Sequence, residues 1–223
     1  MVEWRGVRLL IDAGPDLRYQ LLRADVSHLD GILLTHEHKD HIGGLDDVRA
    51  LNFVDYPEAI HPVDIYATER TLSTVRKDFD YAFVADKYRG VPEICLHAIH
   101  HGEPFRVGDA EIVPIAGRHS ARFEVTGFRF GRLAYLTDFK EIAEEEVRRL
   151  EGVEVLVVNA LRVKPHDSHF NLEEALTLIR RLRPQHAFLT HMSHDMGLHA
   201  ERSRLLPEGV ELAYDTLEIE LND

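Results

Sequence analysis

The sequence predicts an α/β fold in which two mixed β-sheets pack together with helices outside. Two observations support this fold class. Short apolar runs of strand length follow one another through the middle of the chain, and toward the C-terminus such runs alternate with segments of helical periodicity. This order of elements is typical of two packed sheets with outer helices. Because several of the runs end in His or Asp, we expect those side chains to gather along one edge of the layers.

The first third of the chain predicts a hairpin, two further strands and two helices. Arg5-Gly6 separates the two short strands of the hairpin, and Gly43-Gly44 would let the backbone approach its neighbours closely. Thr68 is a suitable N-cap ahead of apolar residues at helical spacing. The expected strands are residues 2–4, 7–11, 31–35 and 63–67, and the expected helices are residues 45–51 and 68–78.

The rest of the chain predicts a strand-rich middle and then alternating strands and helices. Gly-containing turns separate the middle strands, with Phe130-Gly131-Arg132 as a tight hairpin turn. A later helix ends before Pro184, and the tail predicts a closing hairpin. The expected strands are residues 94–99, 111–115, 123–130, 133–137, 153–158, 186–190, 210–213 and 217–221, and the expected helices are residues 141–150 and 172–182.

Length and charge limit the domain number and the partners. The chain has 223 residues, 44% of them hydrophobic, which suffices for one domain spanning residues 1–223. Its formal net charge of −13 repels phosphate-rich polymers, and no long Lys/Arg run overrides that field. We therefore expect no stable nucleic-acid complex, whereas small anions remain acceptable because bound divalent ions dominate the field at close range.

Cysteine content and the N-terminus predict a cytoplasmic protein. The one cysteine, Cys95, lies in an apolar run, so we expect an ordinary buried thiol in a reducing compartment. The N-terminus has no basic-then-apolar signal, and no apolar stretch approaches the ~20 residues that span a bilayer. We expect no association with a membrane.

The run Thr35-His36-Glu37-His38-Lys39-Asp40-His41 is the most informative part of the sequence. In extended backbone His36 and His38 point to the same side and Glu37 to the other, and a turn at Lys39-Asp40 would bring Asp40 and His41 beside them. All four donors on one zinc ion would make a closed structural site, whereas division between two ions leaves positions for water and substrate. The spacing favours two ions, and it does not match the His-Glu-x-x-His motif of zinc proteases.

Three more apolar strands end in side chains that can bind a metal ion. These are His119, Asp138 and His191. Each alone is more typical of a turn or cap. Their occurrence in series after the first cluster indicates a shared metal site.

With this series the chain resembles the metallo-β-lactamase superfamily, whose motif is His-x-His-x-Asp-His followed by a His, a bridging Asp and a final His. The resemblance implies the αβ/βα sandwich fold. It also implies that His36, His38 and His119 hold one divalent ion, that Asp40, His41 and His191 hold another, and that Asp138 bridges both. Imidazole ligands suit zinc, and the carboxylates also admit manganese or iron.

Within the superfamily, the chain is similar to the phosphodiesterase branch that includes the accessory phosphodiesterase of the carbon-phosphorus lyase pathway. The segments that carry this likeness are residues 33–45, 168–175 and 189–195. It implies hydrolysis of a small phosphodiester, such as a cyclic ribose or nucleotide phosphate, by a metal-bridging hydroxide. It also implies that His169 protonates the leaving group, and we place Asp40 with it as a catalytic residue. The alternative role for His169 is that of a loop residue ahead of the N-cap Asn171.

The sequence departs from the family at its N-terminus. Relatives begin with a strand, a Gly-Thr-Gly loop and a cysteine-bearing segment that binds a structural zinc together with a histidine matching His194. This chain starts after them, so we expect no structural zinc. The exposed sheet edge left by the first strand would favour pairing, with a homodimer as one outcome.

Other functions remain open on the sequence. The same metal core supports hydrolysis of thioesters or other acyl substrates, and an inert metal-binding protein is a third alternative. A tRNA-processing role fits less well because no basic arm is evident. Four basic side chains near the donor loops are candidates for orienting a phosphate, and surface charge explains each equally well: Arg118, Arg122, Arg162 and Lys164.

Overall fold

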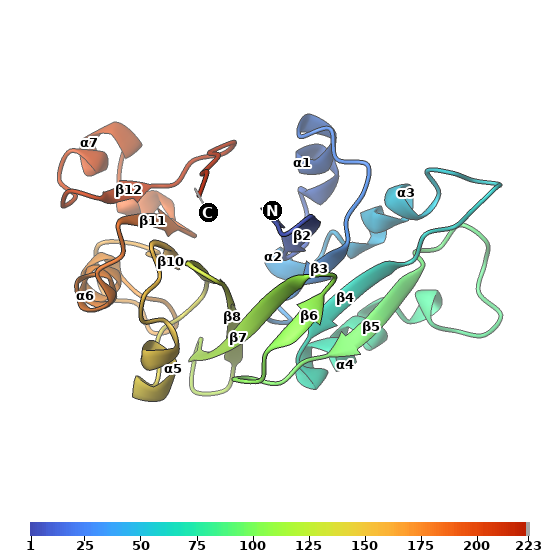
Figure 1. The fold of residues 1–223 in the computed structure, drawn as a ribbon, viewed down its shortest axis with the longest axis horizontal. Coiled ribbons are helices and arrows are strands. Elements are labelled where there is room, and N and C mark those ends of the chain that lie inside the picture. Colours follow the sequence, from blue (N-terminus) through green and yellow to red (C-terminus); the bar gives the residue numbers. More distant parts are fainter. Residues whose placement is uncertain (222–223) are drawn as a thin grey trace. The chain divides into compact units, whose positions relative to one another are not determined.

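The computed structural model describes residues 1–221 (Figure 1), and the chain falls into two compact units, Met1–Pro114 and Ile115–Asp223. The expectation that they form one domain stays a prediction. Among the described residues, no helix is long and apolar enough to cross a membrane.

A five-stranded mixed sheet forms the centre of the first unit, with strand order β1-β2-β3-β4-β5. The first two strands are antiparallel, and the other pairs are parallel. Arg5 and Gly6 close the hairpin with φ angles of 49° and 79°, as a tight two-residue turn requires. The bounds are β1 Val2–Trp4, β2 Val7–Ile11, β3 Gly31–Leu33, β4 Val63–Ala67 and β5 Ile94–Ala98.

Short helices complete the first unit. The helix expected at residues 68–78 is confirmed, whereas the one expected at residues 45–51 is divided into a 3-10 turn and a short α-helix. Helix α1 was not predicted, because it is short and only Leu17 and Leu21 on it are buried. The bounds are α1 Leu17–Arg23, α2 Lys39–Ile42, the 3-10 turn Leu45–Val48, α3 Arg49–Asn52, α4 Glu69–Asp78 and the 3-10 turn Asp80–Ala82.

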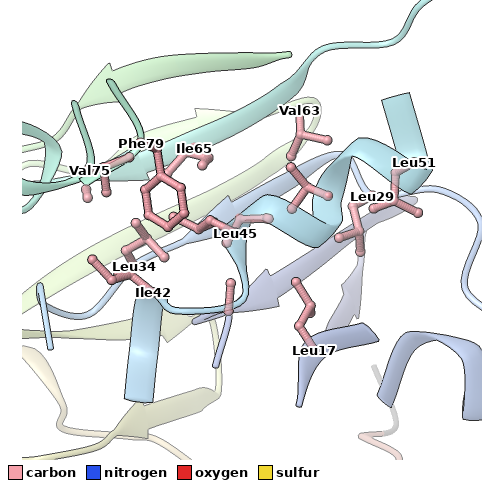
Figure 2. Packing of buried hydrophobic residues seen from close by; sticks show 14 of the residues in the cluster. Leu17, Leu29, Leu34, Ile42, Leu45, Leu51, Val63, Ile65, Val75 and Phe79 are labelled. Atoms are coloured by element: carbon pink, nitrogen blue, oxygen red, sulfur yellow. The ribbon is translucent and has the colours of Figure 1, made fainter. Parts of the chain in front are cut away.

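A hydrophobic core lies between one face of this sheet and these helices (Figure 2). Ile65 from β4, Leu45 from the 3-10 turn and Leu72 from α4 are each fully buried in it. Burial of such a side chain contributes about 1.5–3 kcal/mol. The glycine pair permits the close approach expected from the sequence, because a Cβ atom on Gly44 would lie 2.1 Å from the carbonyl oxygen of Gly14.

The second sheet has seven strands in the order β12-β11-β10-β9-β8-β7-β6, and β7 continues from the first unit into the second. Strands β9 to β12 are parallel to one another, so their C-terminal ends share one edge. Gly131, with a φ angle of 54°, closes the tight antiparallel turn between β8 and β9. The bounds are β6 Phe105–Val107, β7 Ala110–Arg118, β8 Glu124–Phe130, β9 Leu133–Leu136, β10 Val155–Asn159, β11 His186–Thr190 and β12 Val210–Leu212.

The longest helix of the second unit is α6, Leu172–Leu182, at the bounds expected from the sequence. Asn171 and Glu174 form a capping box at its start, with both side chain to backbone distances at 2.8 Å. The remaining helical segments are α5 Glu144–Arg149, the 3-10 turn His194–Met196 and α7 His199–Ser203. The expected α/β class with two mixed sheets is confirmed.

Two expectations were wrong. The tail forms no hairpin: β12 pairs in parallel with β11, and residues 217–221 form no strand. Helix α7 supplies the crossover that such parallel pairing needs. Cys95 is exposed rather than buried. Its neighbours on β5, Ile94 and Leu96, pack against the core, so Cys95 between them points to the opposite face of the sheet.

Candidate metal centre

The first unit carries four donors directly after β3, at the positions expected from the sequence. His36 Nε2 lies 2.9 Å from His38 Nδ1, so these two imidazoles point toward one spot. Glu37 points to the other side, where Arg70 Nε donates to its Oε1 at 2.7 Å. The alternation of extended backbone thus separates the ligand pair from the residue between them.

Helix α2 brings in the other two donors of this unit. His38 is its N-cap, so Asp40 and His41 lie in its single turn. The rings of His36 and His41 have centroids 4.2 Å apart, and His41 Nε2 lies 3.3 Å from Asp40 Oδ2. His36 and His41 are buried while Asp40 is exposed. The turn expected at Lys39-Asp40 is therefore the start of a helix, and the four first-unit donors lie together.

Asp12, which the sequence reasoning missed, organises these donors. Its carboxylate accepts hydrogen bonds from the backbone N–H of Thr35 at 2.8 Å and from Thr35 Oγ1 at 2.8 Å. It also accepts from His41 Nδ1 at 2.6 Å, and Thr35 Oγ1 lies 3.0 Å from His36 Nδ1. The Nδ1 atoms of both imidazoles are thus engaged, which leaves Nε2 as the atom available to a metal ion. A lone Asp directly after the apolar strand β2 was the available signal.

The second unit carries a second donor set at the ends of β7, β9 and β11. His119 and Asp138 are buried, and His119 Nδ1 donates to the backbone carbonyl of Asp138 at 2.9 Å. This bond leaves His119 Nε2 as the atom available to a metal ion. Ligand atoms of His119, Asp138 and His169 all lie within 4.8 Å of one another.

Asp138 is the centre of this second set. Its Oδ1 lies 2.9 Å from His169 Nε2 and 3.3 Å from His191 Nε2, while Thr137 Oγ1 donates to its Oδ2 at 2.6 Å. The rings of His169 and His191 stack with centroids 5.1 Å apart. The carboxylate is 2% exposed, so burial without a cationic partner would be costly. Imidazoles around it therefore indicate a site for positive charge.

Three of these residues share an unusual backbone conformation. Asp12 and His191 directly follow a strand and Asp138 lies two residues after one, and their φ angles are 60°, 61° and 54° in the order Asp12, Asp138, His191. This left-handed region is uncommon for residues other than glycine and costs of order 1–3 kcal/mol each. Such strain persists only where the surroundings fix it, and it concentrates at functional sites.

The loop around His169 contains further polar groups. Ser168 Oγ lies 3.0 Å from His169 Nδ1, and His166 Nδ1 lies 3.3 Å from the same atom. Burial lowers the pKa of His166 below its ordinary value, and the nearby His169 and Arg162 lower it further. His169 is therefore held through Nδ1, with Nε2 directed at Asp138.

The four basic candidates and His194 are half-buried or exposed. Arg162 is engaged within its own loop, where it donates to the carbonyl oxygens of Lys164 and Pro165 at 3.3 and 2.6 Å. The side chains of Arg118, Arg122 and Lys164 are exposed. His194 is 95% exposed beside Asp195. None of these contacts marks a phosphate-binding group.

The donor chemistry fits divalent ions. Zinc–imidazole bonds of about 2.0–2.1 Å in tetrahedral geometry place two ligand nitrogens about 3.3 Å apart, close to the 2.9 Å between His36 Nε2 and His38 Nδ1. The second unit adds a buried carboxylate with an imidazole nitrogen at 2.9 Å. Nitrogen and carboxylate donors of this kind suit zinc, manganese and iron.

Comparison with known proteins identifies the family. A family model described as a beta-lactamase superfamily domain matches residues 7–192. The chain belongs to the beta-lactamase superfamily. Its fold is correspondingly similar to a solved structure of a diphosphatase from the PhnP family, with a TM-score of 0.88 and 37% identity over 99% of this chain and 82% of that one. The expected metallo-β-lactamase fold is thereby confirmed.

The curated relatives do not all bear the same name. Ribonuclease Z of Pyrobaculum aerophilum is 28% identical over 92% of this chain and 84% of its own length. A protein of Porphyromonas gingivalis named octanoyltransferase is 37% identical over 96% of this chain. The chain spans only 42% of that protein's length. The superfamily membership, the diphosphatase and the ribonuclease together identify the chain as a metal-dependent hydrolase.

Proposed function

We propose that this hydrolase cleaves a small phosphodiester, with a cyclic ribose or nucleotide phosphate as the candidate substrate. The observation that carries the proposal is the position of His169, whose Nε2 lies 2.9 Å from the buried carboxylate of Asp138. A proton donor beside the proposed metal ligand is what departure of an alkoxide from phosphorus requires. The likeness to a diphosphatase, over nearly the whole chain, supports phosphorus rather than an acyl group as the centre of attack.

We further propose that both donor sets contribute to a pair of divalent ions, as the superfamily motif implies. One ion would be held by His36, His38 and His119, the other by Asp40, His41 and His191, and Asp138 would be shared. When bound, such ions supply a nucleophile at neutral pH and neutralise negative charge on a phosphate.

The protein's own residues would then position the reaction. Asp12 orients His41 through Nδ1 at 2.6 Å, and Asp138 O orients His119 through Nδ1 at 2.9 Å. Ser168 Oγ at 3.0 Å from His169 Nδ1 holds that ring, so that a proton on Nε2 can pass to the departing oxygen. Asp40, which is exposed, is the proposed ligand with access to incoming substrate.

The decisive assay compares bis-p-nitrophenyl phosphate with acyl thioesters on protein loaded with zinc or manganese. We expect hydrolysis of the phosphodiester, and we expect His36→Ala to abolish it because a buried ligand is lost. His97→Ala is the matched control, since His97 also faces an aspartate, Asp64, at 2.6 Å but belongs to neither donor set. Turnover confined to thioesters, or a metal-loaded protein with no turnover, would contradict the proposal.

A second assay addresses substrate size. We expect cyclic nucleotide monophosphates to be cleaved in preference to a tRNA precursor, because the net charge of −13 repels a polyanion. The ribonuclease Z likeness makes the precursor the necessary comparison. Tight, salt-sensitive binding of tRNA would contradict this part of the proposal. Action in the cytoplasm, without membrane or nucleic-acid partners and with a homodimer as one assembly, also stays a proposal.

A further inference from the structure

We propose that Asn159 is a positioning residue that fixes Asp138 and His169 relative to each other. The proposal rests on the proposed function for the roles of those two side chains. Asn159 ends β10, which lies between β9 and β11 in the sheet, and it is fully buried. It offers no ligand atom to either donor set. Its effect on the chemistry would therefore pass through the backbone that it holds.

The side chain of Asn159 forms hydrogen bonds with both backbone polar groups of Phe139. Its Oδ1 accepts from the backbone N–H of Phe139 at 2.8 Å, and its Nδ2 donates to the backbone carbonyl of Phe139 at 3.1 Å. Phe139 directly follows Asp138, whose φ angle is 61°. The strained aspartate thus lies between the end of β9 and a peptide that the amide side chain holds in place. A left-handed conformation needs such an external constraint to persist.

The same carbonyl also holds the loop that carries His169. The backbone N–H of Phe170 donates to Phe139 O at 2.6 Å, and Leu161 N–H donates to Phe170 O at 2.9 Å. The residue after Asp138 is therefore bonded directly to the residue after His169. Because Asn159 donates to the shared carbonyl, it orders both segments at their point of contact. The 2.9 Å approach of His169 Nε2 to Asp138 Oδ1 depends on this junction.

Packing restrains Phe139 from the other side. Its ring is fully buried against the glycine face of β7, where a Cβ atom on Gly117 would lie 2.1 Å from ring atom Cε1. A Cβ atom on Gly127 of β8 would lie 3.2 Å from ring atom Cζ. Any residue larger than glycine at position 117 of β7 would therefore displace the Phe139 ring. Side-chain packing and the Asn159 amide together leave Phe139 one position.

Asn52 in the first unit provides a matched control for a purely structural role. It too is fully buried, and its Nδ2 donates to the carbonyls of His61 and Glu93 at 2.8 and 3.0 Å. Its Oδ1 accepts from the backbone N–H of Glu93 at 2.9 Å. The two bonds to Glu93 match those that Asn159 makes to Phe139, and Asn52 makes one more to His61, but these bonds hold segments that carry none of the candidate donors. Asn52→Ala and Asn159→Ala should therefore destabilise the metal-free fold alike.

The experiment measures metal affinity and leaving-group dependence in both alanine variants. Competition with a chromophoric chelator should show zinc affinity lowered about 10- to 100-fold in Asn159→Ala and unchanged in Asn52→Ala. The visible spectrum of bound Co²⁺ should change only in Asn159→Ala. If proton donation by His169 is impaired, turnover of alkyl phosphodiesters should fall more than turnover of p-nitrophenyl esters, whose leaving group needs little protonation.

A second variant covers the case in which Asn159→Ala does not fold. Gly117→Ala leaves the amide intact and displaces Phe139 from the opposite side, so it should lower zinc affinity in the same way. Zinc affinity and a Co²⁺ spectrum that match the wild type in a folded Asn159→Ala or Gly117→Ala protein would overturn the inference. So would equal losses of affinity in Asn159→Ala and Asn52→Ala. A wild type that binds zinc but cleaves no phosphodiester would refute the proposed function alone, because the affinity comparison remains valid.

Discussion

Asp12→Asn tests how strongly the residue behind the donors controls metal binding. The substitution keeps size and shape but places an NH2 group where the carboxylate accepts from His41 Nδ1 at 2.6 Å and from Thr35 Oγ1 at 2.8 Å. Because the new NH2 group is a donor facing Nδ1, it stabilises the His41 tautomer whose proton is on Nε2. Nε2 is the atom that lies 3.3 Å from Asp40 Oδ2. The ligand nitrogen is thus blocked without any loss of volume.

The size of the effect follows from that one contact. A hydrogen bond to a charged group contributes about 1.5–3 kcal/mol. Because each 1.4 kcal/mol is a factor of ten in affinity, Asp12→Asn should weaken zinc binding roughly 10- to 100-fold. Outer partners of metal-bound imidazoles have effects of about this magnitude in general.

Chelator competition measures this change, with Asp64→Asn as the matched control. Asp64 pairs with His97 at the same distance of 2.6 Å, but both side chains are more than 40% exposed and serve no donor. That variant should bind zinc like the wild type, because exposed pairs contribute little. If Asp12→Asn keeps wild-type affinity, or loses no more than Asp64→Asn, Asp12 does not orient a ligand and the reasoning is refuted.

Three further predictions concern stability. Leu45→Ala, at a fully buried position, should lower the free energy of unfolding by about 2–5 kcal/mol in urea, and a loss under 1 kcal/mol would show that this core collapses around the cavity. Burial and a hydrogen bond to Asp46 raise the pKa of Tyr81 to about 12. The contribution of the neutral Tyr81 hydroxyl to the free energy of unfolding is therefore complete below pH 10.0 and is lost as the pH rises to about 12. Tyr81→Phe should therefore lose less stability than the wild type over that range, and identical pH profiles would contradict the shift. Removal of metal by a chelator should lower the melting temperature by several degrees, with recovery on reloading, since a ligand at 100 times its Kd adds about 2.7 kcal/mol; an unchanged melting temperature would argue against binding to the folded state.

The sequence could predict that the candidate donors lie near strand ends because their signal is local. An apolar run marks a strand, and a His or Asp directly after it marks the strand's C-terminal end. For β9 and β11, parallel pairing then brings these ends to one edge of the sheet. Helix α6 was predicted at its observed bounds because Asn171 and Pro184 delimit it in the sequence. The shared binding of ions by both sets stays a prediction.

The errors and omissions arose where partners lie far apart in sequence. The tail pairs with β11 rather than with itself, and Cys95 lies on the face of β5 opposite the core. Neither fact can be derived from a local apolar pattern. Asp12 and Asn159 were overlooked although each is a polar residue at the end of an apolar strand. Their importance lies in the bonds that they make to other segments, at separations of up to 29 residues for Asp12.

The left-handed conformation of Asp12, Asp138 and His191 sets protein stability and chemistry against each other. Glycine adopts that conformation without steric cost, so Gly at these positions would relax the backbone while deleting a carboxylate or an imidazole. Directed evolution that screens only for heat resistance would therefore tend to erase these three side chains first. Thermostabilised versions of this hydrolase should be selected with zinc retention as a second criterion.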